Sequence, residues 1–248
     1  MINPSDRPVV LVTGAARRIG AAIARALHAA GFDLALHCRS SRAELDALRG
    51  ELEASRPGST LDLQADLAHA EAAPVLVADT LRRFGRLDGL VNNASAFHPT
   101  PLGEITPQDW DALFAVNARA PLLLAQAAAD ALRGTRGAIV NLVDIYAERP
   151  LPGYSVYAMS KAALTAATLA LAGELAPEVR VNGIAPGAVL WPESGKDETA
   201  RADILARTPL ARTGEPADIA GTVLWLLRDA RFVTGQVIRV DGGRTLPI

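Results

Sequence analysis

A tyrosine and a lysine stand four positions apart in the middle of the chain, at Tyr157 and Lys161. On a helix, this spacing places both side chains on one face. An ammonium group beside a phenol favours the phenolate and lowers the pKa of the phenol, which starts near ~10, by roughly 1–3 units. The pair is therefore suited to proton exchange near neutral pH. The same spacing also occurs at the surfaces of ordinary amphipathic helices.

A carboxyl group precedes this pair in the chain. The apolar run at residues 138–143 predicts a strand, which delivers Asp144 to the loop before the helix of Tyr157. A carboxyl group in this loop can accept a hydrogen bond or pass a proton when it is protonated. The alternative is that Asp144 caps a helix or a turn.

Strands and helices alternate through the rest of the chain. Strands are expected at residues 9–13, 33–37, 60–65, 86–92, 138–143, 179–185 and 236–240. Helices are expected at residues 17–30, 40–55, 71–84, 107–133 and 215–228, besides the helix of Tyr157. Residues 188–212 depart from this alternation and are the expected substrate lid. Neither a linker nor a repeat divides the chain, which predicts one domain over residues 1–248.

A glycine-rich turn follows the first predicted strand, in the segment TGAARRIG. Gly14 ends the strand, and Gly20 lies near the start of the next helix. A strand, a turn and a helix in this order can bind a pyrophosphate through backbone N–H groups, although an ordinary turn has the same pattern. Arg18 stands where a middle glycine is expected. Its guanidinium is expected beside the cofactor phosphates or the substrate, unless it is a solvated arginine at a helix start.

The end of the second predicted strand indicates the type of cofactor. In this arrangement an acidic residue would bind the ribose 2′-OH, whereas a cation accommodates a 2′-phosphate. No acid stands there, and Arg39 offers a guanidinium fork that suits phosphate. We therefore predict NADP(H), with a solvated arginine as the alternative. After the third strand, Asp66 is expected either to accept from the adenine amino group or to cap a helix.

The fourth predicted strand leads into a polar segment and a proline-rich loop. Asn93, Ala94 and Ser95 are small enough to let the backbone approach a flat cofactor, or they form an ordinary polar turn. Phe97 in the loop can stack on a ligand or anchor the packing of the loop. Asn117 stands among apolar neighbours and needs a partner, either the backbone or a water that leads toward Lys161.

Composition excludes several classes of function. The chain has 248 residues and a net charge of −2, so bulk charge favours neither nucleic acid nor a membrane surface as a partner. Cys38 is the only cysteine, which excludes an internal disulfide and fits a reducing compartment. The start of the chain has no pattern of a signal peptide, and the apolar stretch at residues 162–172 is too short to span a bilayer. We expect a cytoplasmic protein without a metal site.

Several of these segments together resemble the short-chain dehydrogenase/reductase family. The segments that stand in the order of that family are TGAARRIG, NNAS, Asn117, Tyr157 with Lys161, Pro186-Gly187 and Asp241-Gly242-Gly243. Within the family, the sequence is most similar to pteridine reductases and dihydromonapterin reductases. The supporting details are Arg18, the segment His37-Cys38-Arg39-Ser40, the loop at residues 95–101, and Asp144, where most members carry serine.

The resemblance implies a fold, an assembly and an activity. The implied fold is a single-domain Rossmann fold with a doubly wound, seven-stranded parallel sheet and helices on both faces. The implied assembly is a homotetramer, built partly through the helix of Tyr157. The implied activity is the NADPH-dependent reduction of a dihydropterin to the tetrahydro form, with dihydrobiopterin, dihydromonapterin and dihydrofolate as candidate substrates. The alternatives are a carbonyl reductase for a 3-oxoacyl or sugar ketone and a regulator without turnover, against which the intact Tyr157 and Lys161 argue.

The resemblance also implies roles for matching residues. Tyr157 would donate a proton, Lys161 would lower its pKa and bind the nicotinamide ribose, Asp144 would assist, and Asn117 would hold a water. The pterin would stack between Phe97 and the nicotinamide. The implied NADPH site is Gly14, Arg18, Ile19, Gly20, His37, Arg39, Ser40, Asp66, Leu67, Asn93, Ala94, Ser95, Tyr157, Lys161, Pro186 and Gly187. The 2′-phosphate in it would go to Arg39, His37 and Ser40. The implied substrate site is Arg18, Ser95, Phe97, Asp144, Tyr157, Val189 and Leu190, with Val189 standing where some relatives have a serine.

Overall fold

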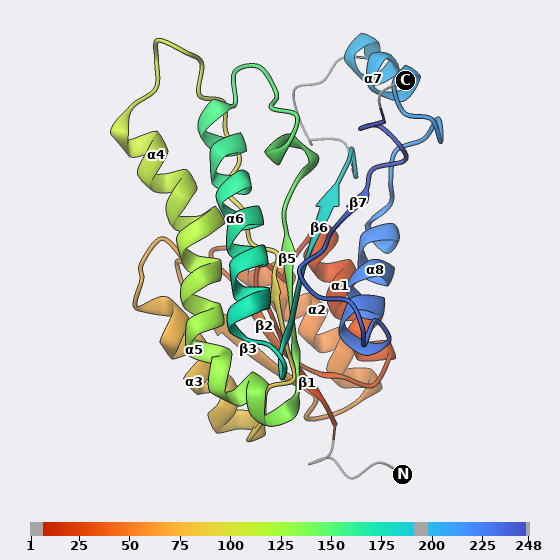
Figure 1. Cartoon of the computed structure of the whole chain (residues 1–248). Coiled ribbons are helices and arrows are strands. Elements are labelled where there is room, and N and C mark those ends of the chain that lie inside the picture. Colours follow the sequence, from red (N-terminus) through yellow and green to blue (C-terminus); the bar gives the residue numbers. More distant parts are fainter. Residues whose placement is uncertain (1–6, 191–197, 247–248) are drawn as a thin grey trace.

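The computed structural model describes residues 7–190 and 198–246. Seven parallel strands form one sheet in the order β3-β2-β1-β4-β5-β6-β7 (Figure 1). They are β1 (Val9–Val12), β2 (Asp33–Cys38), β3 (Thr60–Gln64), β4 (Gly89–Asn92), β5 (Ala138–Leu142), β6 (Arg180–Pro186) and β7 (Val237–Val240). This arrangement confirms the predicted doubly wound sheet with its seven strands.

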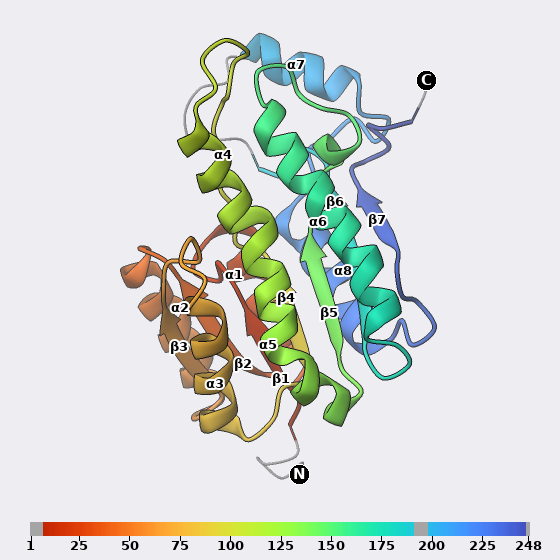
Figure 2. The same ribbon diagram turned by 60° about the vertical axis from the view of Figure 1, so that its left-hand side comes forward.

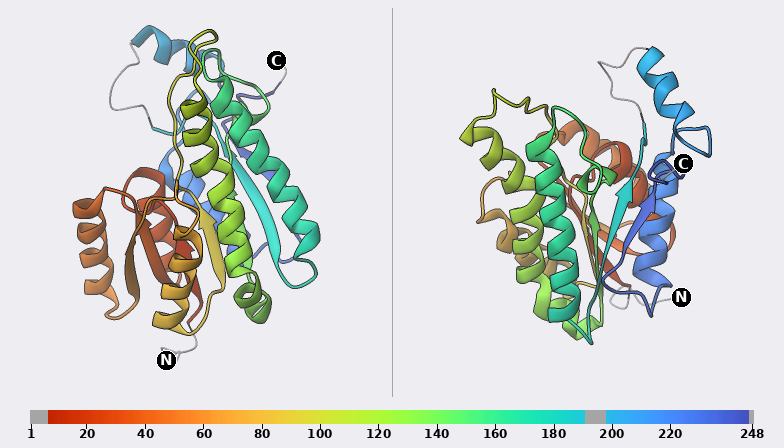
Figure 3. Two further views of the ribbon diagram at one scale, coloured as in Figure 1. Left: turned by 90° about the vertical axis from the view of Figure 1, so that its left-hand side faces the viewer. Right: turned by 45° about the horizontal axis from the view of Figure 1, so that its top comes forward.

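Helices cover both faces of the sheet (Figures 1 and 3). One face is covered by α1 (Arg18–Ala29), α2 (Arg42–Ser55) and α8 (Pro216–Arg228). The other face is covered by α3 (Ala72–Phe84), α5 (Ala120–Thr135) and α6 (Ser155–Glu174). Strands buried on both sides lack an apolar–polar alternation, and every residue of β1 and β2 is indeed buried.

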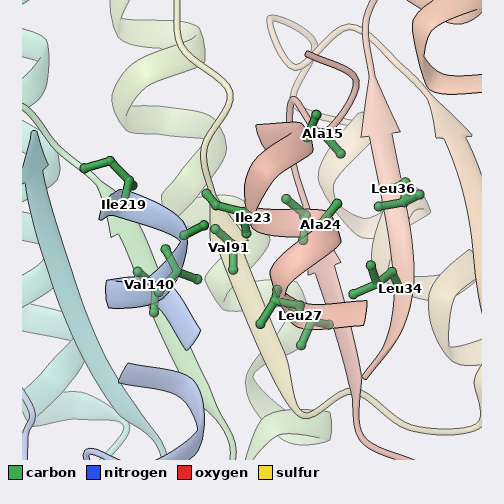
Figure 4. Close-up of a cluster of buried hydrophobic side chains, with 14 of the residues drawn as sticks. Ala15, Ile23, Ala24, Leu27, Leu34, Leu36, Val91, Val140 and Ile219 are labelled. Carbon is green, nitrogen blue, oxygen red and sulfur yellow. The ribbon is translucent and has the colours of Figure 1, made fainter. Parts of the chain in front are cut away.

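The core under α1 shows how the helices are fixed to the sheet (Figure 4). Ile23, Ala24 and Leu27 of α1 are spaced along one face of the helix and are fully buried. They belong to one cluster with side chains from three strands and from α8, namely Leu34, Leu36, Val91, Val140 and Ile219. This packing sets the position of the N-terminus of α1 at the carboxyl edge of the sheet.

The strand order creates a crevice at that edge. The chain moves outward from β1 to β2 and β3, and then returns to place β4 on the other side of β1. At such a switch point the loops after the two strands diverge, and ligands bind between them. The helix α7 (Glu198–Ala206) and the start of α6 lie at the same end of the molecule (Figure 2).

The helix predicted at residues 107–133 contains an irregularity. It consists of α4 (Pro107–Phe114), a π-helical turn η2 (Ala115–Arg119) and α5. Such turns occur frequently at functional sites, and this one holds Asn117, whose side chain is fully buried. A widened turn leaves the apolar pattern of the helix nearly unchanged, so the sequence did not reveal it.

Two helical stretches are long and apolar enough to cross a membrane, Pro107–Thr135 and α6. The sequence predicted that the apolar stretch at residues 162–172 is too short to span a bilayer. The helix α6 is longer, at 20 residues, so its length alone does not exclude a membrane span. Its position does, because α6 packs on the sheet through buried residues that include Leu171 and Ala172. Both stretches are therefore core helices of a soluble fold.

Candidate active site

Tyr157 and Lys161 lie on the first two turns of α6, as predicted, and both are buried. The loop before α4 fixes this end of the helix. The Thr100 N–H donates to the Gly153 carbonyl at 2.6 Å, and the Thr100 hydroxyl accepts from the Val156 N–H at 3.3 Å. The start of α6 is thus tied to the carboxyl edge of the sheet.

The Lys161 ammonium donates to the Leu142 carbonyl oxygen at the end of β5, at 2.8 Å. It makes no other hydrogen bond to the described part of the chain, so two of its N–H groups remain available for a ligand. Burial lowers the pKa of Lys161 to about 8, against the charge of Asp144, which raises it. The side chain therefore titrates close to neutral pH.

Asp144 occupies both roles that the sequence left open. It precedes the turn η3 (Ile145–Ala147), and its Oδ1 accepts from the Tyr146 N–H at 2.9 Å as a cap. Its Oδ2 accepts from the Tyr157 hydroxyl at 2.7 Å. Burial raises the pKa of the carboxyl group, and these two donors together with the charges of Lys161 and Arg244 act in the opposite direction.

The pKa of Tyr157 is raised, which corrects the expectation that Lys161 lowers it. Burial is the largest cause, followed by the charge of Asp144 and the hydrogen bond to it, while the Ser95 hydroxyl acts weakly in the other direction. The physical reason is that a phenolate is costly in a buried site, and more costly still beside a carboxylate. The ammonium of Lys161 lies 5.9 Å from the centre of the phenol ring. Tyr157 therefore keeps its proton and acts as a hydrogen-bond donor.

Asn117 connects the loop after β4 to α6. Its Oδ1 accepts from the Ala96 N–H at 2.8 Å and from the Ser95 hydroxyl at 3.0 Å. Its Nδ2 donates to the Ala96 carbonyl at 2.9 Å and to the Ser160 hydroxyl at 3.0 Å. All four hydrogen-bonding positions of the side chain are used. This favours the backbone-binding alternative over a water held by the Asn117 side chain.

A cleft of about 670 Å³ lies beside this corner, over the switch point of the sheet. Most residues of the predicted NADPH site line it, namely Gly14, Arg18, Ile19, Gly20, His37, Arg39, Ser40, Asp66, Leu67, Asn93, Ala94 and Ser95. Phe97 also lines the cleft. The remaining four predicted cofactor residues lie outside this lining, on α6 and at the end of β6: Tyr157, Lys161, Pro186 and Gly187.

Two glycines allow the segments that line this cleft to pack closely against one another. Gly14 has a φ of +63°, and a Cβ there would lie 3.0 Å from the Ala94 Cα. A Cβ at Gly20 would lie 2.0 Å from the Gly14 carbonyl oxygen. The Asn93 amide closes the arrangement, because it donates to the carbonyl oxygens of Thr13 and Gly14 at 2.9 Å each. A close-packed glycine-rich turn that leads into the N-terminus of a helix fits the pyrophosphate of a dinucleotide.

Arg18 has a φ of +52°, in the left-handed region where a glycine is relaxed. This conformation explains why a glycine is expected at the position. A residue with a Cβ incurs a cost of about 1–2 kcal/mol there. Backbone strain of this kind occurs frequently at functional sites.

His37 does not match the role that the resemblance implied. Its ring is buried, with Nδ1 at 3.3 Å from the Gly14 amide nitrogen and Nε2 at 3.1 Å from the Ala65 carbonyl oxygen. Both ring nitrogens are thus occupied within the fold, and neither is free for a 2′-phosphate. Arg39 and Ser40, the other two residues that the resemblance assigned to the 2′-phosphate, are exposed at the tip of β2.

Asp66 and Phe97 show how the loop residues are arranged. The Asp66 carboxylate accepts from the Ala68 N–H at 2.9 Å in the turn after β3; it does not cap α3, whose N-cap residue is Glu71. The ring of Phe97 stacks on Tyr154 with centroids 4.6 Å apart, and it meets Tyr157 edge-on at 4.7 Å. Phe97 anchors the loop in this way, yet 52% of its surface remains exposed beside Tyr157.

The predicted lid is described only in part, because residues 191–197 lie outside the described residues. The buried Val189 side chain belongs to the core cluster that includes α1 and α8, so it packs inward rather than toward the cleft. Leu190 has a φ of +61° and is more exposed. The segment then continues through α7 and returns to the sheet, where the Gly214 N–H donates to the Ala188 carbonyl at 2.9 Å.

Sequence reasoning missed Arg244, whose positive charge acts on both Asp144 and Tyr146. Arg244 follows β7 in a turn that is held by the Asp241 carboxylate, which accepts from the N–H groups of Gly243 and Thr245 at 2.9 Å each. Its only sequence signal was its place directly after the Asp-Gly-Gly segment. No group of metal-binding side chains occurs among the described residues.

Comparisons with known proteins agree with this arrangement. The model of a family described as Enoyl-(Acyl carrier protein) reductase matches residues 14–245. Pteridine reductase 1 of Leishmania tarentolae is 38% identical over 287 aligned positions that cover 99% of each chain. An uncharacterised oxidoreductase of Methylorubrum extorquens is 40% identical, over 95% of this chain and 96% of its own. A 3-oxoacyl-[acyl-carrier-protein] reductase of Synechocystis is 36% identical, over 96% of this chain and 97% of its own. These similarities indicate an oxidoreductase, and they do not select between the substrates that the names give.

Proposed function

The chain belongs to the short-chain dehydrogenase/reductase family, and we propose that within it the protein is an NADPH-dependent pteridine reductase. Its substrate would be a dihydropterin, such as dihydrobiopterin, dihydromonapterin or dihydrofolate, which is reduced to the tetrahydro form. The single observation that carries this proposal is the hydrogen bond from the Tyr157 hydroxyl to Asp144 Oδ2 at 2.7 Å. It places a carboxyl group beside the proton donor, where most members of the family carry a serine.

This carboxyl group suits a pterin better than a ketone. A ketone gains negative charge on its oxygen as it is reduced, and an ionised carboxylate nearby would oppose that charge because it cannot donate a hydrogen bond. A pterin instead presents ring nitrogens, one of which must gain a proton. A carboxylate can accept from a ring N–H, and a carboxyl group can pass a proton on. Asp144 beside Tyr157 therefore favours the nitrogen heterocycle.

The reaction adds a hydride to an imine carbon and a proton to the adjacent nitrogen. When bound, NADPH supplies the hydride. In our proposal Tyr157 provides the proton, and Asp144 orients the phenol and accepts from a pterin N–H. The two free N–H groups of Lys161 bind the nicotinamide ribose. The exposed face of Phe97 receives the flat ring, and Arg18 and Ser95 line the site. Holding the reacting atoms about 3–3.5 Å apart is a large part of such catalysis.

The choice of NADPH over NADH is part of the proposal. Two features at the tip of β2 support it: Arg39 is exposed there, and no acidic side chain stands at residues 37–41. An arginine can bind a phosphate with two parallel hydrogen bonds, whereas an acid would repel the 2′-phosphate. Gly14, Gly20, Asn93 and the small residues after β4 would hold the remainder of the dinucleotide.

We also propose a cytoplasmic homotetramer and a lid at residues 188–212. The helices α5 and α6 expose the apolar side chains Leu122, Met159 and Leu169, which supports burial of this surface against a second copy. The position of α7 beyond the carboxyl ends of the strands supports closure of the segment over the substrate (Figure 3). Val189 and Leu190 would then contribute to the substrate site mainly through their backbone.

One assay tests the substrate. Initial rates of NADPH oxidation would be measured with dihydrobiopterin, dihydromonapterin, dihydrofolate and an acetoacetyl thioester at several concentrations. The expected result is a kcat/KM for at least one dihydropterin that clearly exceeds the value for the thioester. A preference for the thioester over all three pterins would reject the pterin assignment and leave membership of the family intact.

A 3-oxoacyl reductase is the second candidate, because the relative from Synechocystis carries that activity in its name. The matched family description also refers to acyl carrier protein. The same assay decides between the two, since the thioester is the test substrate for this alternative. A complete lack of turnover with every substrate, despite cofactor binding, would instead support a regulatory protein.

A further inference from the structure

The imidazole of His37 bridges two loops that meet under the nucleotide cleft. Nδ1 faces the Gly14 amide, which can only donate, so Nδ1 must be the unprotonated acceptor. Nε2 then carries the hydrogen and donates to the Ala65 carbonyl oxygen at 3.1 Å. Each nitrogen of a neutral ring is thus matched to the partner that it faces. The opposite tautomer would place two donors against each other at Gly14.

Burial keeps this ring neutral. Only 1% of the surface of His37 is exposed, and this burial lowers its pKa below the usual value of 6.5. The Ala65 carbonyl and the charge of Asp66, which lies just beyond β3, favour the protonated ring, but their effect is smaller. A protonated ring would also lose its bond to Gly14. The neutral imidazole is therefore the state that the fold holds.

His37 fixes two consecutive amides of the glycine-rich loop. Its ring accepts from the Gly14 N–H, and its backbone carbonyl oxygen accepts from the Ala15 N–H at 2.8 Å. On the other side of the loop, the Asn93 amide donates to the Gly14 carbonyl. The turn that leads into α1 is thus held from both sides, which determines the direction of the N–H groups that follow it.

From this geometry we propose that His37 is a positioning residue for the nucleotide-binding loop and makes no contact with the 2′-phosphate. Its neutral ring holds Gly14 in the left-handed conformation that brings the start of α1 to the pyrophosphate. The pyrophosphate is common to NADH and NADPH. Loss of the ring must therefore affect both cofactors alike, whereas loss of a phosphate ligand affects NADPH alone.

The test compares His37→Leu with His37→Asn and measures the Kd of NADPH and of NADH for each. Leucine fills the space without an acceptor and leaves the partly buried Gly14 N–H without this hydrogen bond. Because an unsatisfied buried donor costs about 1–3 kcal/mol, we expect both Kd values to rise by about tenfold. Asparagine places its Oδ1 near the position of Nδ1, so it should restore most of the affinity for both cofactors.

Arg39→Ala is the comparison variant. Loss of a side chain that binds the 2′-phosphate should weaken the binding of NADPH only. In His37→Leu the loss should fall on the KM for the cofactor, with kcat at saturation little changed, because Tyr157 and Lys161 are not touched. If His37→Leu does not fold, His37→Gln replaces it, since its amide reaches Ala65 and leaves Gly14 unpaired. A loss confined to NADPH, or no rescue by asparagine, would overturn the proposal. The Kd values are measured without substrate, so the comparison of NADPH with NADH is independent of the pterin assignment.

Discussion

The Tyr157 hydroxyl donates to Asp144 Oδ2 over 2.7 Å; burial raises the pKa of the phenol, and the charge of Asp144 and this hydrogen bond raise it further. The phenol that would deliver a proton is thereby held in its protonated form, aimed at an acceptor 13 residues earlier in the chain. Lys161 supports it only from a distance, because its ammonium is bonded to the Leu142 carbonyl.

Replacing Tyr157 by phenylalanine keeps the ring but removes this proton donor and its hydrogen bond to Asp144 Oδ2. Positioned acid catalysis contributes about 10²–10⁴-fold, so Tyr157→Phe should lower kcat by about 100-fold or more. The Kd of NADPH should stay nearly unchanged. Tyr154→Phe is the matched control, because it removes a phenol hydroxyl nearby and keeps the stacking on Phe97. A turnover of Tyr157→Phe equal to that of the wild type would remove Tyr157 from the mechanism.

Asp144→Ser tests the distinction between a pterin and a ketone. A serine hydroxyl can donate to a developing oxyanion but provides no carboxyl group for a ring nitrogen. We expect this variant to lose dihydropterin reduction, while any activity toward an acetoacetyl thioester is kept or raised. If Asp144 only caps the turn η3, the variant should instead lose thermal stability and be impaired toward every substrate equally.

Arg39→Ala tests the cofactor preference. Hydrogen bonds between charged groups contribute about 1.5–3 kcal/mol, so the variant should bind NADPH at least roughly tenfold more weakly and NADH almost normally. Arg42→Ala serves as the control, since Arg42 on α2 is already paired with Asp46 and Asp62. Equal losses for NADPH and NADH in isothermal titrations would show that Arg39 does not recognise the 2′-phosphate.

The conformation of Arg18 predicts a difference between two substitutions. Both Arg18→Gly and Arg18→Ala remove the guanidinium, but only glycine relaxes at a φ of +52°. Arg18→Gly should therefore be more stable than Arg18→Ala, by about 1–2 kcal/mol in chemical denaturation. Both variants should show a raised KM for the pterin. Equal stabilities would mean that the backbone rearranges at this position.

Arg244 predicts a change in the pH dependence. Its charge lowers the pKa of Asp144, which burial raises, so Arg244→Gln should raise the pKa of Asp144 further. If an ionised Asp144 holds the phenol, the acidic limb of the kcat/KM profile should move to higher pH. The alkaline limb, which reports Lys161 with its pKa of about 8, should move less. Arg239→Gln is the control, since Arg239 on β7 is paired with Glu148. An unchanged acidic limb in Arg244→Gln would separate Asp144 from the pH dependence.

The sequence by itself determined the order of the strands and helices and the placement of Tyr157 and Lys161 on one face of α6. These features depend on local periodicity, and a spacing of four residues places two side chains on the same face of a helix. The resemblance assigned Gly14, after β1, and Asn93, after β4, to one cofactor site, and both residues line the cleft.

Only the tertiary structure decided what the site residues contact. β2 is buried on both faces, so no alternation in the sequence told whether His37 points toward the cleft or into the fold. The hydrogen bonds of the Asn117 side chain need Ala96 and Ser160 as partners. The positive charge that acts on Asp144 comes from Arg244, which follows the last strand. Such contacts join segments that are far apart in the chain. The pKa values of the site residues follow from burial and neighbouring charges, which exist only after the chain has folded.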